Sequence, residues 1–225
     1  MLFKGFTKTS ISFLNDLALN NNKNWFGENR AIYEKHILEP LRQLTTELGI
    51  AIKSIDDEID IRPQINRTIS KIFRDTRFSK DKSPFRTDQW ISFKRPSGIW
   101  GNVPEFYFYF TPEEYHYGMG FYDTIPANME KFRDYIISYP DRFEKIMNYY
   151  QSQSIFVPRG VNYKKHIPNT LPETYQEWFH KKNLYVSRIK TIDNTFFSAG
   201  LKDEIENAFQ VNAELYHFLI ESITQ

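Results

Sequence analysis

Cysteine is absent from the 225-residue chain. This absence excludes a disulfide framework, a thiolate nucleophile and a metal site with cysteine ligands. No apolar run approaches the roughly 18–20 residues that span a bilayer. The chain begins Met1-Leu2-Phe3-Lys4-Gly5-Phe6, without the basic and apolar regions of a signal peptide. We therefore expect a cytoplasmic protein that has no membrane partner.

A large net charge is missing as well. The chain has 29 Lys and Arg against 28 Asp and Glu, which gives a formal net charge of +1. Such a chain has no strong overall field to attract nucleic acid or anionic lipid, so any electrostatic recognition must be local. Nucleic acid is therefore a disfavoured partner.

The short motifs of several enzyme classes are missing too. The sequence has no P-loop, no GxGxxG opening a dinucleotide-binding unit and no GxSxG nucleophile elbow. Its histidines lack HxH or HExxH spacing, and the acids of residues 56–60 suit a solvated turn better than a metal cradle. We expect no cofactor and no metal, and the sequence does not decide whether the protein is an enzyme. The histidines are His36, His116, His166, His180 and His217.

The composition that is present indicates a globular chain. Hydrophobic residues make up 40% and charged residues 25%, and 20 Phe and 14 Tyr raise the aromatic content to 17%. A chain of this size can bury roughly three quarters of its unfolded surface. Without an internal repeat or a Gly/Ser linker, residues 1–225 are expected to form a single domain.

Helical periodicity predicts helices at both ends of the chain. Ser10 or Thr9 is expected to cap the first helix, and Pro40 to kink or split a longer helix that ends at Gly49. The expected helical segments contain Phe13–Leu17, Tyr33–Leu48, Asn128–Ser138, Asp141–Gln151, a short helix that Pro172 opens through Glu177–Phe179, and a closing helix Leu201–Ile223.

Strands are expected in the middle of the sequence. The segments are Ile50–Ile55, Gln89–Lys94, Glu105–Thr111, Tyr115–Tyr122 and Leu184–Ile189. The sequence thus predicts an α+β fold, with a mostly antiparallel central sheet packed by N-terminal and C-terminal helices.

Positive charge is concentrated between Arg67 and Arg86, where seven basic residues meet two acids for a local charge of +5. If Pro63–Arg74 is a helix, it has an apolar face and an opposite basic face that is open to solvent. The following residues, Arg74 to Thr87, alternate charge and hydroxyl groups through a turn. Such a turn suits a phosphate or carboxylate ligand, but an internal ion-pair network fits it equally well.

The same residues resemble a known family. The run from Arg74 to Pro84, RDTRFSKDKSP, resembles the hallmark of the family called domain of unknown function 2461, conserved hypothetical proteins of bacteria and fungi. Further similarity covers most of the chain: Phe13-Leu14, Leu17, Asn21-Asn22-Lys23, Trp25-Phe26, Arg30, Tyr33, Pro40, Gly118-Met119-Gly120 and Arg133. Members usually carry Tyr-Lys where this chain has Phe85-Arg86. The resemblance implies a stand-alone cytoplasmic domain, and it implies no known activity.

The aromatic segments around residues 105–122 predict a hairpin with a two-residue turn. This register places Tyr109 opposite His116, and Tyr107 and Glu105 opposite Gly118 and Gly120. Glycines opposite tyrosines leave a hollow that a ligand, another backbone or a packed helix can fill. A three-residue turn would move the glycines to the phenylalanine face.

Three functions remain open. The first is a pocket for a small phosphate- or carboxylate-bearing ligand, with Asp75, Asp81 and His116 as candidate acid/base groups if chemistry follows. The second is a nucleic-acid binding module, and the third is a structural or protein-interaction domain with an internal ion-pair lock. The oligomeric state is not determined by the sequence. The candidate ligand-binding residues are Arg74, Arg77, Ser79, Lys80, Lys82, Arg86, Tyr107, Tyr109, Gly118 and Gly120.

Overall fold

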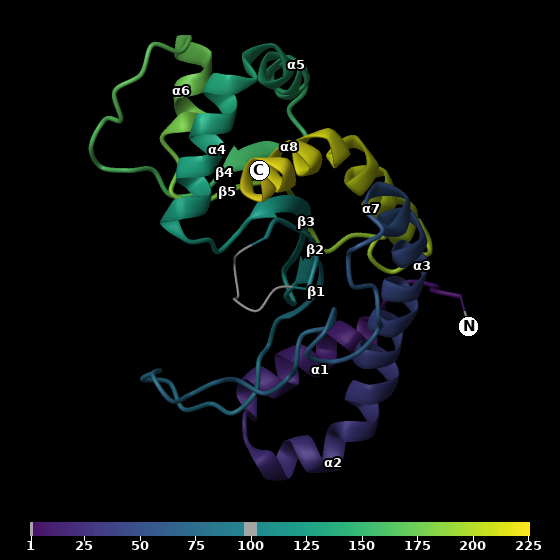
Figure 1. The fold of residues 1–225 in the computed structure, drawn as a ribbon. Helices are drawn as coiled ribbons and strands as arrows, with labels where there is room; N and C mark the ends of the chain where they lie inside the picture. The colour runs from purple at the N-terminus through teal and green to yellow at the C-terminus, as the bar shows by residue number, and fades with distance from the viewer. Residues whose placement is uncertain (1, 97–102) are drawn as a thin grey trace. The chain divides into compact units, whose positions relative to one another are not determined.

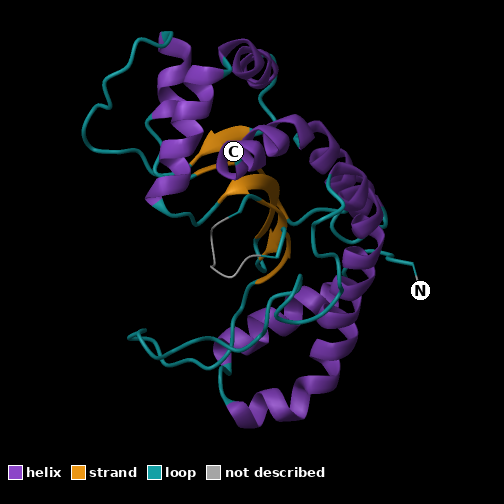
Figure 2. Cartoon of the chain, viewed as in Figure 1, coloured by secondary structure: helices purple, strands orange, loops and turns teal. Residues whose placement is uncertain are grey.

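A computed structural model describes residues 2–96 and 103–225, and these residues form helices and a five-stranded antiparallel sheet (Figures 1 and 2). The strand order is β1-β2-β3-β5-β4. The predicted α+β class is confirmed, and so are four of the five predicted strands. The strands are β1 (Gln89–Phe93), β2 (Glu105–Phe110), β3 (Glu114–Phe121), β4 (Val157–Arg159) and β5 (Leu184–Thr191).

Prolines mark the first turns of two helices. Pro126 and Pro140 lie in the first turns of α4 and α5, as predicted, because a first-turn proline loses no hydrogen bond. The helical elements are α1 (Lys8–Leu19), α2 (Lys23–Tyr33), the π-helix η1 (Glu34–Leu38), α3 (Glu39–Ile55), α4 (Pro126–Ser138), α5 (Pro140–Gln151), α6 (Glu173–Phe179), α7 (Gly200–Val211) and α8 (Ala213–Thr224).

The chain divides into two compact units, each made of separate stretches of sequence. Unit 1 is Met1–Phe93, Tyr107–Tyr117 and Ile189–Ala208; unit 2 is Lys94–Phe106, Gly118–Arg188 and Phe209–Gln225. Whether the chain behaves as one domain stays a prediction.

The core of unit 1 centres on Phe6, which is 2% exposed. Its ring centroid lies 4.7 Å from that of Phe110 and 4.8 Å from that of Phe196. The helix that follows begins earlier than predicted, because Thr7 is its cap and Ser10 completes a capping box. The expectation that Thr9 or Ser10 caps this helix was therefore wrong.

Helix α3 continues past Gly49 to Ile55, so two predictions fail together: the helix end at Gly49 and a strand at Ile50–Ile55. Ala51, Ile52 and Ile55 extend its buried face, which outweighs the strand preference of the isoleucines. Gly49 lies inside the helix, where an added Cβ would be 3.2 Å from the Cβ of Ile61. The predicted split near Pro40 is present, since η1 precedes the proline.

The predicted helix Pro63–Arg74 is wrong. Asn66 adopts a left-handed φ of 64° in a tight turn, and the chain then runs beside β1. The Ser70 N–H donates to the Trp90 carbonyl at 3.0 Å, and the Ser92 N–H donates to that of Thr68 at 2.8 Å. Backbone groups at the edge of β1 thus supply hydrogen-bond partners that this segment would otherwise find within a helix.

Unit 2 packs α4, α5 and α8 together. The Phe106 ring lies 5.1 Å from that of Phe209 and 4.9 Å from that of Tyr216. The predicted closing helix is two helices, α7 and α8, with Asn212 between them. Asn212 is 1% exposed and its side chain accepts a hydrogen bond from the Tyr150 hydroxyl at 2.5 Å, a contact that favours a break over a continuous helix.

Candidate functional site

The basic segment forms a projecting hairpin, which we call the basic hairpin (Ile72–Arg86). At its base the Arg74 N–H donates to the Pro84 carbonyl at 2.9 Å, and the Arg86 N–H donates to that of Ile72 at 2.8 Å. Figure 1 shows it as two adjacent extended arms that project from unit 1. The candidate ligand-binding groups therefore lie on a protruding element of unit 1.

The base of the basic hairpin is anchored by α2 and the residues before it. The Asn21 side chain donates to the Phe85 carbonyl at 2.9 Å and accepts from the Phe85 N–H at 3.0 Å. The Phe85 ring is 1% exposed and stacks on Phe26 with centroids 4.3 Å apart. The Phe85 ring thus packs in the interior, and this packing does not need the hydroxyl of a tyrosine.

Both acids of the basic hairpin pair inside it. Arg77 Nη2 lies 2.6 Å from Asp75 Oδ2, and Arg74 Nη1 pairs with Asp81 Oδ2. The hydrogen bond from Arg77 holds the pKa of Asp75 well below its usual value, and those from Ser83 and Arg74 do the same for the pKa of Asp81. Both carboxyls are ionised at neutral pH, which argues against either as a general acid.

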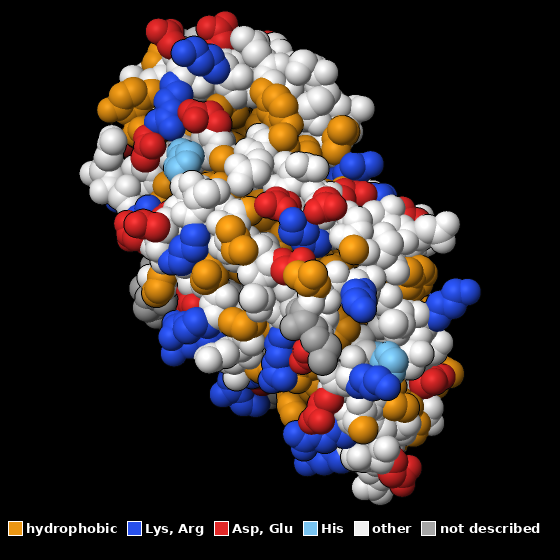
Figure 3. Space-filling model, turned by 90° about the vertical axis from the view of Figure 1, so that its right-hand side faces the viewer, with side chains coloured by type: hydrophobic (Ala, Val, Ile, Leu, Met, Phe, Trp, Pro, Cys, Tyr) orange, Lys and Arg blue, Asp and Glu red, His pale blue; other side chains and the backbone are white. Residues whose placement is uncertain are grey.

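The remaining charge of +3, five bases less two acids, belongs to Lys80, Lys82 and Arg86. Lys82 Nζ donates to the Thr76 carbonyl at 2.9 Å, and the Arg86 guanidinium lies 4.9 Å from the Trp90 ring centroid. Lys80 is exposed and has no side-chain partner among the described residues. On the face drawn in Figure 3, Lys and Arg occur in small groups among Asp and Glu.

The predicted register of the β2–β3 hairpin is confirmed at the positions nearest the turn. The Thr111 N–H donates to the Glu114 carbonyl at 2.9 Å, and the Tyr109 and His116 rings lie 5.4 Å apart. His116 Nε2 is 2.9 Å from Glu114 Oε1, a close contact with a carboxylate that lacks hydrogen-bond geometry. Whether Tyr107 and Tyr109 share a site with the basic hairpin stays a prediction.

The hollow expected at Gly118 and Gly120 is filled by backbone. A Cβ on Gly118 would be 1.9 Å from the Val186 carbonyl oxygen, and one on Gly120 would be 2.4 Å from that of Leu184. Gly120 also has a φ of 143°, which favours glycine. The two glycines let β5 approach β3 closely, so their expected ligand-binding role is corrected to packing.

A pocket of about 560 Å³ in unit 2 was missed by sequence reasoning. We call it the cationic pocket. Its basic residues come from separate segments, which explains why no local cluster revealed it. The only sequence signal is weak: residues 157–183 carry five basic and two acidic residues, the same surplus of +3 as Arg74–Arg86 but over a longer stretch. Its lining residues are Tyr122, Pro158, Arg159, Gly160, Val161, Lys181, Asn183 and Tyr185.

Within residues 2–96 and 103–225, no three His, Asp or Glu side chains are grouped so that they could hold a metal ion. None of the helices formed by these residues has the length and apolar character to cross a membrane.

Comparison with known families gives one match. Residues 9–218 match the family described as "Conserved hypothetical protein (DUF2461)". The chain belongs to this DUF2461 family. No curated protein matches it, so membership assigns no activity. Asn21 and Phe26, two of the residues that carried the resemblance, hold Phe85 at the base of the basic hairpin in this DUF2461 protein.

Proposed function

We propose that this DUF2461 protein binds a ligand bearing phosphate or carboxylate groups through the tip of the basic hairpin. The observation that carries the proposal is the pairing of Asp75 with Arg77 and of Asp81 with Arg74. This pairing uses both acids and leaves the charge of Lys80 and Lys82 without a carboxylate. Ammonium groups beside the Ser79 hydroxyl and turn amides form a set of donors suited to an oxyanion.

An internal lock is the weaker explanation of the same ion pairs. The Arg77 side chain is 77% exposed and that of Asp75 is 45% exposed. Exposed pairs contribute little to stability because water and salt screen them. They are better suited to fixing the shape of the tip, since each aspartate also accepts a backbone N–H two residues later.

Nucleic acid is kept as a second candidate because of Phe78. Its side chain is 95% exposed at the tip, and the Arg77 guanidinium lies 5.7 Å from its ring centroid. An exposed ring among cations can stack on an unpaired base while the cations contact phosphates.

A cytoplasmic location is likewise proposed from the sequence alone.

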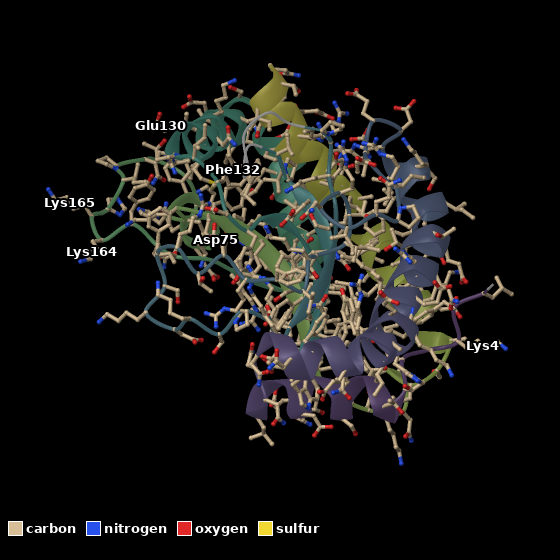
Figure 4. All side chains as sticks on the ribbon, turned by 90° about the horizontal axis from the view of Figure 1, so that it is seen from below. Lys4, Asp75, Glu130, Phe132, Lys164 and Lys165 are labelled. Atoms are coloured by element: carbon tan, nitrogen blue, oxygen red, sulfur yellow. The ribbon has the colours of Figure 1, made fainter. Side chains whose placement is uncertain are left out.

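Calorimetric titration with tripolyphosphate, citrate and a single-stranded oligonucleotide tests the proposal. We expect the double variant Lys80→Gln/Lys82→Gln to bind the preferred probe about tenfold more weakly or worse, since each lost charged hydrogen bond costs roughly 1.5–3 kcal/mol. The matched control is Lys4→Gln/Lys8→Gln, which removes two exposed lysines of unit 1. Figure 4 shows Lys4 pointing to solvent, far from Asp75 of the basic hairpin.

Two outcomes would contradict the proposal. One is the absence of binding of all three probes to wild type, and the other is an equal loss of affinity in the control variant. Preference for the oligonucleotide, with affinity that falls steeply with salt and is reduced in Phe78→Ala, would move the assignment to nucleic acid.

A further inference from the structure

We infer that the cationic pocket of unit 2 is a separate site for a small organic phosphate or carboxylate, bound by Lys181 and Arg159. This site is independent of the basic hairpin, which belongs to unit 1. A volume of about 560 Å³ lies within the usual range of small-molecule sites, roughly 300–1,000 Å³.

The wall of the pocket is built from paired backbone. Strand β4 pairs with β5 so that Arg159 lies opposite Tyr185. Gly160, at a φ of 121°, passes so close to Asn183 that a Cβ would be 1.9 Å from its carbonyl oxygen. The Asn183 side chain accepts from the Val161 N–H at 2.8 Å and donates to the Tyr122 carbonyl at 2.7 Å. These contacts fix the lining before any ligand binds, which favours binding.

The positive charge of the pocket indicates an anionic ligand. The Lys181 side chain is 7% exposed, yet Nζ lies 3.7 Å from Glu177 Oε1 and 3.5 Å from the Gly160 carbonyl oxygen. Both distances exceed those of good charged hydrogen bonds, about 2.7–2.9 Å. A buried ammonium without close partners is unfavourable, and an anion in the pocket would supply the missing charge.

Arg159 adds to this charge, and Arg133 lies beside the backbone of Lys181 outside the lining. Arg133 is 7% exposed, and its Nη1 is 3.5 Å from the Lys181 carbonyl oxygen while its guanidinium faces the Tyr163 and Phe179 rings at 5.4 and 5.9 Å. The Arg159 Nε is buried without a hydrogen-bond partner among the described residues. None of the described lining residues is acidic; Glu177, whose carboxylate lies 3.7 Å from Lys181 Nζ, is outside the lining.

The rest of the lining indicates the other part of the ligand. The rings of Tyr122 and Tyr185 lie 5.0 Å apart, and Pro158 and Val161 complete an apolar side. Such a surface favours a planar or apolar group attached to the anion. The ligand class is therefore a small organic anion rather than an inorganic ion alone.

Calorimetric titration of the full chain with phenyl phosphate, benzoate and inorganic phosphate tests this inference. We expect wild type to bind phenyl phosphate or benzoate more tightly than inorganic phosphate. Lys181→Met should weaken that binding by about tenfold or more, because a charged hydrogen bond is lost. The matched control is Lys182→Met, which removes the neighbouring exposed lysine outside the pocket lining and should keep wild-type affinity.

A second variant and a melting curve make the test decisive. Arg159→Gln should also weaken binding. Lys181→Met should melt without ligand at or above the wild-type temperature, because a buried charge with only long contacts to Glu177 and Gly160 is removed. The Lys80→Gln/Lys82→Gln variant should bind phenyl phosphate as wild type does, which separates this site from the basic hairpin. The inference is overturned if no organic probe binds, if Lys182→Met loses as much affinity, or if Lys181→Met melts well below wild type.

Discussion

Lys190 shows how a half-buried lysine is compensated in this protein. Its Nζ lies 2.9 Å from Glu204 Oε2 and 3.1 Å from Asp193 Oδ2 in unit 1. Burial acts to lower the pKa of Lys190, but hydrogen bonds to Tyr115, Glu204 and Asp193 outweigh it and raise that pKa. Lys181 of unit 2 is more deeply buried, and among the described residues it has no comparable pair of acids. This contrast at the scale of single residues is the reason to assign a ligand to Lys181.

The contrast predicts that a Lys→Met substitution affects stability differently at the two positions. Lys190→Met should lower the free energy of unfolding by about 2 kcal/mol, because it leaves two partly buried carboxylates unpaired. Lys181→Met should cause no such loss. Urea denaturation of both variants at neutral pH measures the difference, and equal destabilisation of the two would contradict this account.

At the scale of elements, the basic hairpin depends on Asn21 for its position. The side chain of Asn21 makes both a donor and an acceptor contact with the Phe85 backbone. Asn21→Ala should therefore lower the free energy of unfolding by roughly 1–3 kcal/mol, the range for two hydrogen bonds, and speed hydrogen exchange at the Phe85 amide. Asn24→Ala, an exposed asparagine of α2, is the control and should leave that amide protected. Unchanged exchange in Asn21→Ala would show that the hairpin is held in another way.

The same scale separates what the sequence could predict from what it could not. The aromatic strands Glu105–Phe110 and Glu114–Phe121 were predictable, because alternation and a Pro-containing turn are local signals. The helix proposed for Pro63–Arg74 failed because the hydrogen bonds that decide its structure come from β1, a later part of the chain. The turn within Arg74–Arg86 was located by its turn-forming residues, among them Ser83 and Pro84. Which acid pairs with which arginine depends on the hairpin geometry, which these local signals do not give. The cationic pocket was missed because its lining residues Tyr122, Arg159 and Lys181 are far apart in the sequence.

For the whole molecule, the perturbed carboxyls predict the response to acid. Hydrogen bonds from Arg142 and Tyr135 hold the pKa of Glu221 below its usual 4.5, although burial acts in the opposite direction. The unfolded chain therefore binds a proton here before the folded chain does. The stabilisation from Glu221 is complete above about pH 4.5 and is lost as pH falls through the lower folded pKa. Asp60, Asp75, Asp81 and Asp193 also have lowered pKa values, so their contributions have the same sign.

Stability should accordingly fall as pH drops from 5 to 3, and Glu221→Gln should weaken this dependence. The urea midpoint, followed across that range, is the measurement. Glu130→Gln changes an exposed glutamate of α4 that has no ion-pair partner among the described residues, and it should follow wild type. A Glu221→Gln curve parallel to that of wild type would mean that this network does not contribute to acid sensitivity.

The central claim is that the basic hairpin binds an anion, and amide chemical shifts test it most directly. Titration of ¹⁵N-labelled protein with tripolyphosphate should give saturable shifts concentrated at Thr76–Ser83, the tip of the hairpin. Saturable shifts confined to Arg159–Val161 and Lys181–Asn183 would support the cationic pocket and contradict the claim for the hairpin. Weak, non-saturating shifts spread over exposed lysines such as Lys4 and Lys8 would contradict both.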